Sequence, residues 1–144
     1  MIRSWWFDRQ HHRSDLERLK LFAGCSSGQL KAIDMLGTRV RVVAGRSLTV
    51  VGDPGREVFV VLEGCAACVV KGQTTLFGPG EIFGEVALLD GGPRTATVSA
   101  ETDMHLLVLD RHEFDQLLQV APDLSLRLLR VLAGRLRHAD DDAA

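Results

Sequence analysis

The pattern of hydrophobic and polar residues divides the chain into a helical start, a middle of short strands and a helical end. Leu30, Ile33 and Leu36 recur at three-residue steps, which is the spacing of one face of a helix. In residues 38–42 the period changes to two, as in a strand with one buried face. The helical period returns in the last part of the chain. We therefore expect a mainly β fold with N-terminal helices and C-terminal helices.

Capping residues indicate where the helices begin. Ser-x-x-Glu from residue 14 and Ser-x-x-Gln from residue 26 both have the spacing of a capping box. Asp110 can cap a third helix, and Pro122 suits the first turn of a fourth because its missing N–H would have no partner there. The predicted helices are about Asp15–Phe22, Ser27–Leu36, Asp110–Gln119 and Pro122–His138.

The last predicted helix has two different sides. Its hydrophobic residues recur at helical spacing, and a group of arginines lies apart from them, which is more often a solvated face than a nucleic-acid patch. The hydrophobic side carries Leu124, Leu128, Val131, Leu132 and Leu136, and the basic side carries Arg127, Arg130 and Arg137.

The pattern in the middle of the chain predicts many short strands separated by glycine turns. Gly72-Gln73 is a plausible two-residue hairpin loop, and glycines also mark the turns near residues 45, 52–55 and 78–80. Close and regular spacing of short strands favours an antiparallel β-roll, the double-stranded jelly roll. The predicted strands are Arg39–Val42, Leu48–Val51, Val58–Leu62, Cys68–Lys71, Thr74–Phe77, Thr95–Ala100 and Met104–Leu109.

Composition fits one globular domain of 144 residues, with 46% hydrophobic and 25% charged residues. A net charge of -2 argues against DNA or RNA as a direct partner. No apolar run has the length of a membrane span, and Asp8 interrupts the start before a signal-peptide core forms. We therefore expect a cytoplasmic protein. Trp5, Trp6 and Phe7 either fold back on the roll, are mobile, or serve an interface.

The cysteines and histidines do not predict a disulfide framework or a metal centre. Cys25, Cys65 and Cys68 are an odd number, and the last two would point to opposite faces of a strand. A jelly roll also suggests a cupin-type metal enzyme, but no three of the five histidines have metal-ligand spacing. We expect no metal, no cofactor and no catalysis.

The segment Pro79–Ala96 carries the candidate chemistry. It consists of a glycine turn, a short helix-like stretch, a second glycine turn and an arginine that enters a strand. Gly84 lets a ligand approach the backbone closely, and the amides that follow can point at an anion. Arg94 has a planar fork that matches phosphate oxygens, and Glu85 can accept from a sugar hydroxyl. Together these groups suit a sugar phosphate.

This segment resembles the phosphate-binding cassette of the cyclic nucleotide-binding domain family, of the catabolite activator protein type. The resemblance rests on Phe83–Leu89 and Pro93–Val98, and weaker similarity extends over Leu21–Leu136. It implies a domain over 21–138, preceded by an N-terminal segment with a short helix over 1–20 and followed by a disordered acidic tail over 139–144.

The resemblance also implies a role for each matching position. Glu85 would accept from the ribose 2′-hydroxyl, Arg94 would pair with the phosphate oxygens, and Thr95 would contact the phosphate through its hydroxyl and amide. Gly84 and the amides of Val86 and Ala87 would line the pocket floor. The final helix would then change position and close over the base.

Several features of the chain leave the ligand and the output open. Threonine at position 95 is compatible with both nucleotides, and a bacterial source would favour cAMP over cGMP. With no aromatic residue after Phe114, the base would be covered by Leu129, Leu132, Leu136 or Arg130, or by a residue from outside this domain.

No helix-turn-helix follows the last helix in this sequence, so we expect the output to pass to a protein partner or to an output domain outside it. A homodimer stays open. The alternative function is a structural or protein-interaction module of the same fold with a non-functional pocket.

Overall fold

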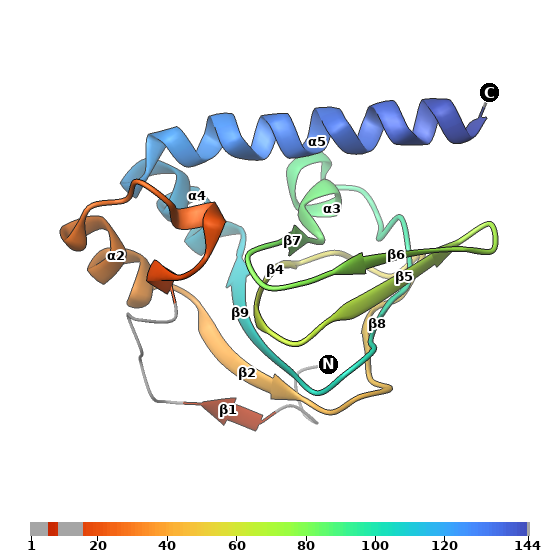
Figure 1. The fold of residues 1–144 in the computed structure, drawn as a ribbon, viewed down its shortest axis with the longest axis horizontal. Coiled ribbons are helices and arrows are strands. Elements are labelled where there is room, and N and C mark those ends of the chain that lie inside the picture. The colour runs from red at the N-terminus through yellow and green to blue at the C-terminus, as the bar shows by residue number, and fades with distance from the viewer. Residues whose placement is uncertain (1–5, 9–15, 144) are drawn as a thin grey trace.

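The computed structural model describes residues 6–8 and 16–143, with side chains over 16–137. Two antiparallel sheets face each other, and helices from both ends of the sequence pack on the outer side of the larger sheet (Figure 1). This confirms the predicted antiparallel β-roll with flanking helices.

The two sheets are formed by strands that are distant in the sequence. In the larger sheet, β4 and β2 both pair with β9, which therefore lies at its centre. The larger sheet has the order β1 (Trp6–Asp8), β2 (Thr38–Val42), β9 (Met104–Asp110), β4 (Glu57–Glu63) and β7 (Ile82–Phe83). The smaller sheet has the order β3 (Ser47–Thr49), β8 (Val98–Ala100), β5 (Ala66–Val70) and β6 (Gln73–Phe77).

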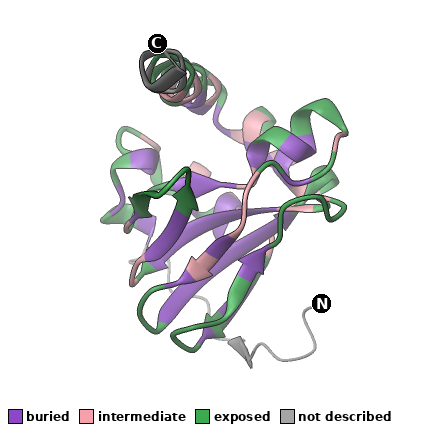
Figure 2. Cartoon of the chain, turned by 90° about the vertical axis from the view of Figure 1, so that its right-hand side faces the viewer, coloured by how far each residue is buried: buried purple, intermediate pink, exposed green. Residues whose placement is uncertain are grey.

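Strand β4 explains why the core has two parts. All residues of 58–62 are buried, and because side chains alternate along a strand they divide between its two faces. Figure 2 shows that burial is concentrated in the strands, whereas many of the turns between them are exposed. Val58, Val60 and Leu62 pack with the helices. Phe59 and Val61 pack between the two sheets. Residues 58–62 of β4 are therefore all hydrophobic because both faces of the strand are covered.

The helices begin where the capping residues predicted. At the start of α2, the Ser26 hydroxyl accepts from the Gln29 amide at 3.1 Å, and at the start of α4 the Asp110 carboxylate accepts from the Glu113 amide at 2.8 Å. Both capping boxes are complete. The described helices are η2 (Lys20–Phe22), α2 (Ser27–Asp34), α3 (Glu85–Asp90), α4 (Arg111–Val120) and α5 (Pro122–Ala143).

The first predicted helix, 15–22, is interrupted. Only residues 16 and 17 are helical before the chain turns, and Leu19 has an extended backbone before η2 begins. Leu19 and Leu21 are both buried, although a continuous helix would place them on opposite sides. The break allows both leucines to enter the core. The start of this helix, including Ser14, lies outside the described residues.

The turn of the β5–β6 hairpin lies one residue earlier than predicted. Val70 pairs with Gln73, so Lys71 and Gly72 form the two-residue loop in place of Gly72-Gln73. Both loop residues have positive φ, 53° and 78°, which is the requirement of the tight hairpin turn whose twist matches the strands.

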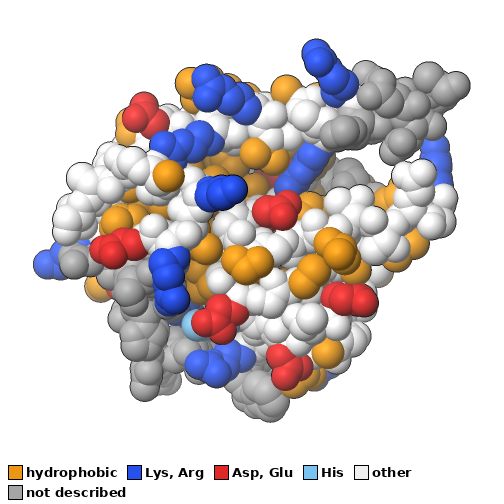
Figure 3. Space-filling model, viewed as in Figure 1, with side chains coloured by type: hydrophobic (Ala, Val, Ile, Leu, Met, Phe, Trp, Pro, Cys, Tyr) orange, Lys and Arg blue, Asp and Glu red, His pale blue; other side chains and the backbone are white. Residues whose placement is uncertain are grey.

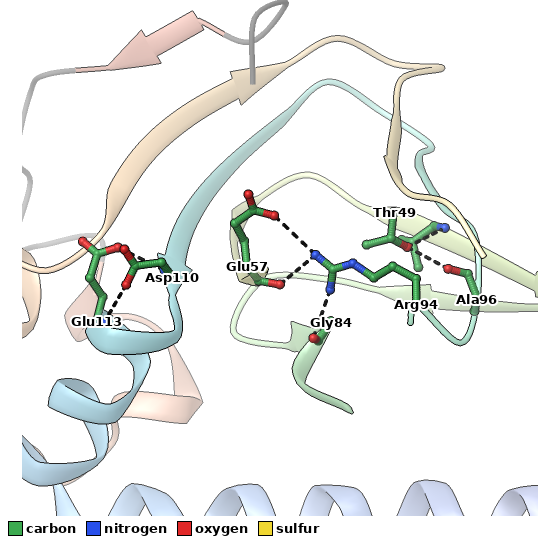
Figure 4. Close-up of polar contacts among 8 residues, drawn as sticks. Thr49, Glu57, Gly84, Arg94, Ala96, Asp110 and Glu113 are labelled. Atoms are coloured by element: carbon green, nitrogen blue, oxygen red, sulfur yellow. Dashed lines mark hydrogen bonds and ion pairs between the residues drawn. The ribbon is translucent and has the colours of Figure 1, made fainter. Parts of the chain in front are cut away.

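Strand β8 begins later than predicted, at Val98 rather than Thr95. The Thr49 hydroxyl donates to the Ala96 carbonyl and accepts from the Val98 amide, at 2.9 and 3.1 Å (Figure 4). These side-chain contacts replace the strand pairing at residues 95–97, so the chain bends as it leaves the candidate cassette.

Arg39 of β2 departs from the predicted alternation. It is 3% exposed, whereas the period of two places arginines 39 and 41 on the outer face. Asp34, at the end of α2, forms an ion pair with it at 2.8 Å. Burial of a charge is possible here because the oppositely charged partner is supplied by a helix packed over the strand.

At both ends of the chain, secondary structure continues beyond the elements that the sequence predicted. Residues 6–8 form β1 and pair with β2, so this part of the aromatic segment lies against the roll; Trp5 is outside the described residues. Helix α5 continues through 139–143, where the sequence predicted a disordered tail, because no proline or glycine there interrupts it. The boundaries of the domain stay a prediction.

Candidate functional site

A pocket of about 190 Å³ lies between the smaller sheet, α3 and the C-terminal half of α5. It contains two buried charged side chains, those of Glu85 and Arg94, which are 3% and 6% exposed. The structure brings together all six candidate residues of the sequence at this pocket: Gly84, Glu85, Val86, Ala87, Arg94 and Thr95. What each one does to a ligand stays a prediction.

A second, larger groove of about 740 Å³ lies between α3, the turn at 52–56 and the start of α4. Its charged side chains, Arg56, Asp110 and Arg111, are exposed to solvent. A specific polar site needs groups held in a desolvated place, so size alone does not make this groove the functional site. We assign the site to the smaller pocket.

Arg94 points into the protein and is held at both ends of its guanidinium group (Figure 4). One terminal nitrogen donates to the Gly84 carbonyl at 3.1 Å, and the other donates to the Glu57 carbonyl at 2.9 Å and lies 3.5 Å from the Glu57 carboxylate. These contacts use three of the five N–H groups that an arginine carries, which leaves two donors for an anion.

Burial changes the electrostatic environment of Arg94. Removal from water lowers the pKa of its guanidinium group from the usual value, and the negative charge of Glu57 opposes that change. Because an arginine pKa is so high, the group still carries its charge at neutral pH. The pocket wall therefore presents a fixed positive charge in a desolvated place.

Glycine at position 84 makes this arrangement possible. It has a φ of 86° and is the N-terminal cap residue of α3. A Cβ atom at this position would lie 2.8 Å from the nearer guanidinium nitrogen of Arg94 and 3.2 Å from the Glu57 carbonyl oxygen. Any other residue would both strain the backbone and push Arg94 away.

Glu85 is held by a residue that the sequence analysis did not single out. Arg135 of α5 forms an ion pair with Oε1 of Glu85 and donates to the Ile82 carbonyl at 2.5 Å. Its guanidinium group also lies over the Phe77 ring, 5.1 Å from the ring centre. Arg135 lies seven residues after Leu128, so helical spacing places it on the hydrophobic side of the helix, apart from the three grouped arginines. This position was the only feature of the sequence that could have singled it out.

The residues that the sequence offered as a cover for the base are placed differently. Leu129 and Leu136 are 62% and 68% exposed, and Arg130 is exposed as well. Leu132 is half-buried but does not line the pocket. Arg135 is the α5 residue that lines it.

The fold and this site define a class of protein, namely β-roll modules whose pocket holds a buried guanidinium group and a buried carboxylate and is bordered by the C-terminal helix. A family model described as the cyclic nucleotide-binding domain matches residues 39–120, more than half of the chain. The chain belongs to this family and is a cyclic nucleotide-binding regulatory domain.

Relatives of the chain include transcriptional regulators and channels. It is 27% identical over 135 residues to the CRP-like cAMP-activated global transcriptional regulator of Mycobacterium tuberculosis, covering 90% of this chain and 60% of that protein. It is 41% identical over 88 residues to a cyclic nucleotide-gated potassium channel of Mesorhizobium japonicum, covering 60% of this chain and 24% of the channel.

Among solved structures, the catabolite activator protein of Thermus thermophilus superposes with a TM-score of 0.73 at 33% identity. The match covers 85% of this chain and 60% of that one. This chain thus spans less than two thirds of the length of these three relatives.

Two other classes of site were sought in the part of the chain that the structure describes. It contains no group of three His, Cys, Asp or Glu side chains that could hold a metal ion. No described helix combines the length and the apolar character needed to cross a membrane.

Proposed function

We propose that the chain binds cAMP in preference to cGMP at the pocket of Glu85 and Arg94, and that binding changes the position of α5. The observation that carries the proposal is the buried guanidinium group of Arg94, held in place with two donors left over at the wall of the pocket. A cyclic phosphate is an anion of matching size and geometry.

In this proposal the remaining pocket residues contact either the phosphate or the ribose of the ligand. Thr95 supplies a hydroxyl and an amide to the phosphate, and the amides of Val86 and Ala87 face it from the first turn of α3. Glu85 accepts from the ribose 2′-hydroxyl. Gly84 has no side chain, so the sugar phosphate can approach the backbone closely.

The proposed role is regulatory and not catalytic. Relatives named as a cAMP-activated transcriptional regulator and a nucleotide-gated channel support a module that passes on a change of shape. The output passes to a protein partner or to a domain outside this sequence, without direct contact to nucleic acid by this chain. The predicted cytoplasmic location rests on the sequence alone.

One observation favours the rival function, a protein-interaction module with a non-functional pocket. The Glu85 carboxylate already has a partner in Arg135, and the Arg94 guanidinium group has one in Glu57. In that case both charges would serve the fold and the pocket would accept no nucleotide.

Titration calorimetry with cAMP and cGMP separates the two functions. We expect binding of cAMP by the wild-type chain and weaker binding of cGMP. Arg94→Ala should lose roughly 2–5 kcal/mol of binding free energy, because the substitution removes the partner of a desolvated phosphate.

Arg46→Ala is the matched control, since Arg46 is exposed and does not line the pocket. Circular dichroism establishes that both variants are folded. Equal affinity of Arg94→Ala and the wild type would reject the assignment, and absence of binding to both nucleotides would favour the interaction module.

A further inference from the structure

Positive charge by itself does not distinguish Arg94 from the rest of the protein. Figure 3 shows Lys and Arg side chains along the edge of the molecule that α5 forms. What sets Arg94 apart is that its side chain is only 5% exposed and is held in one place. A charge interacts more strongly with an anion where water is excluded. The residues that fix this side chain therefore matter to the site as much as the charge does.

The segment 52–57, which leads into β4, holds the backbone of Arg94. The Gly52 amide donates to the Arg94 carbonyl at 2.9 Å, and the Arg94 amide donates to the Asp53 carbonyl at 2.7 Å. These two bonds run in opposite directions between the same short stretches of chain. The start of the Arg94 side chain therefore has a fixed place relative to this segment.

The same segment also holds the far end of the Arg94 side chain. A terminal guanidinium nitrogen donates to the Glu57 carbonyl at 2.9 Å (Figure 4). The Glu57 carboxylate lies 3.5 Å from that nitrogen. With both ends attached to segment 52–57, the middle of the side chain must pass over the residues between them.

Gly55 is the residue over which the side chain passes. A Cβ atom at position 55 would lie 3.2 Å from both Cδ and Nε of Arg94, and it would overlap the methyl group of Ala87. The φ of Gly55 is not in the left-handed region, so the backbone conformation does not require glycine here. What requires it is the space that a side chain would take.

The two neighbours of Gly55 are both predicted parts of the anion site. Arg94 supplies the guanidinium group, and Ala87, in the first turn of α3, supplies one of the amides. Neither can easily move away from a new methyl group, because Arg94 is attached at both ends and the Ala87 methyl is fixed to the helix backbone. One bare stretch of backbone thus sets the distance between segment 52–57 and both phosphate-facing groups.

Segment 52–57 contributes little to the core. None of residues 52–56 is buried, and Gly55 lines the outer groove and not the pocket itself. A surface segment without buried side chains is not shaped by hydrophobic packing of its own. Its contacts with Arg94 and α3 are therefore the main feature that its conformation serves.

We propose that Gly55 is a positioning residue for the anion site: its lack of a side chain lets Arg94 and the first turn of α3 lie against segment 52–57, which directs the guanidinium group into the pocket. The identity of the anion rests on the proposed function. The inference adds a residue that lies outside the cassette and does not touch the ligand.

The first test uses nuclear magnetic resonance of the nucleotide-free protein. Gly55→Ala should raise the solvent exchange of the Arg94 Nε–H at least about tenfold, since a lost hydrogen bond of a charged group is worth roughly that factor or more. Gly78→Ala is the matched control, because Gly78 also has an ordinary φ and a Cβ there would have its nearest neighbour at 3.9 Å. It should stay within about twofold of the wild type.

Two results of this measurement would overturn the proposal. One is equal exchange of the Arg94 Nε–H in Gly55→Ala and the wild type. The other is loss of the folded state in Gly55→Ala, measured by circular dichroism, since Gly55 would then be needed by the fold as a whole.

The second test is titration with cAMP. Gly55→Ala should bind cAMP at least about tenfold more weakly than the wild type, because the guanidinium group no longer points correctly at the phosphate. Gly78→Ala should bind within about twofold of the wild type. Unchanged affinity in Gly55→Ala would overturn the proposal.

The Arg94→Ala background distinguishes positioning from a general structural effect. With the guanidinium group gone, Gly55→Ala should weaken cAMP binding further by at most about threefold, and nuclear magnetic resonance titration reaches the millimolar affinities that this comparison needs. Independent effects would instead multiply. A further loss as large as in the wild-type background would show that Gly55 acts apart from Arg94 and would overturn the proposal.

The outcomes separate this inference from the proposed function. Absence of cAMP and cGMP binding by the wild type, together with faster Nε–H exchange in Gly55→Ala, rejects the nucleotide function and supports the positioning of Arg94 by Gly55. Binding of cAMP by the wild type and equally by Gly55→Ala rejects the positioning role alone.

Discussion

Two buried charges, those of Glu85 and Arg94, dominate the pocket, and each is satisfied by a partner of opposite sign. Arg94 is anchored by carbonyl groups that belong to the backbone of Gly84 and Glu57, so its position depends on the path of the main chain more than on any one side chain. Glu85 depends on a single side chain, that of Arg135. A single side-chain substitution can therefore remove the partner of Glu85, but it cannot remove the carbonyl groups that hold Arg94.

Gly84→Ala should disturb Arg94 as well as the backbone. Alanine at a φ of 86° costs about 1–2 kcal/mol, and the added Cβ would lie 2.8 Å from a nitrogen of Arg94. We expect the free energy of unfolding to fall by about 3 kcal/mol and cAMP affinity to fall at least about fivefold.

Gly91→Ala provides the control, because Gly91 also has a positive φ, 72°, but a Cβ there would have nothing within 4 Å. Urea unfolding should show a loss of only about 1–2 kcal/mol for this variant. An equal loss in both variants would mean that Gly84 is needed for its backbone conformation and not for the approach of Arg94.

Helix α5 is the element in which the hydrophobic pattern and the packing disagree. Its hydrophobic side continues along the sequence to Leu136, yet burial ends at Leu128, where the helix passes beyond the N-terminal elements and α4. The first half is a core helix. The second half is attached to the domain through Arg135 and the half-buried Leu132.

Two adjacent leucines test this division of α5. Leu128→Ala should lower the free energy of unfolding by about 2–4 kcal/mol, because Leu128 is 6% exposed and its removal leaves a cavity. Leu129→Ala should change it by less than about 0.5 kcal/mol, since Leu129 is 62% exposed. Similar losses in urea unfolding would show that the exposed side of α5 is covered in solution.

As a whole molecule, the domain places its candidate pocket beside the part of the core that lies between the two sheets, because Cys68, Phe77, Phe83 and Val98 belong to both. Helices pack on one face of the larger sheet, and the pocket opens from the smaller sheet toward α3 and α5. The pocket is also linked to β4, because Arg94 donates to the Glu57 carbonyl and Phe83 stacks on Phe59.

Ligand binding should stabilise the whole domain by mass action. At a free cAMP concentration of 100 times Kd, the native state gains about 2.7 kcal/mol, which raises the Tm of a domain of this size by roughly 10 °C. Differential scanning calorimetry should show this rise in the wild type and at most about 3 °C in Arg94→Ala at the same cAMP concentration, because a loss of about 2 kcal/mol or more leaves the variant below about 4 Kd. A rise of equal size in both proteins would contradict binding at Arg94.

The residue pattern alone predicted the fold class, the starts of α2 and α4, and the candidate cassette, because each depends on the spacing of a few neighbouring residues. Capping boxes at Ser26 and Asp110, the period of two in β2, and the glycines around 84 act over a few residues. The hydrophobic run of β4 shows that a strand is buried but not that helices cover one face and a sheet the other.

Only the tertiary structure decided which charges meet. Arg39 is buried and pairs with Asp34, only five residues away, whereas Arg135 reaches Glu85 because α5 crosses α3, fifty residues away in the sequence. A charged residue in an amphipathic pattern is expected in solvent, and nothing local indicates that a distant element will supply its partner. Long-range electrostatic pairs depend on how elements are placed in space, so the sequence by itself pointed to Glu85 and Arg94 but not to Arg135, the partner of Glu85.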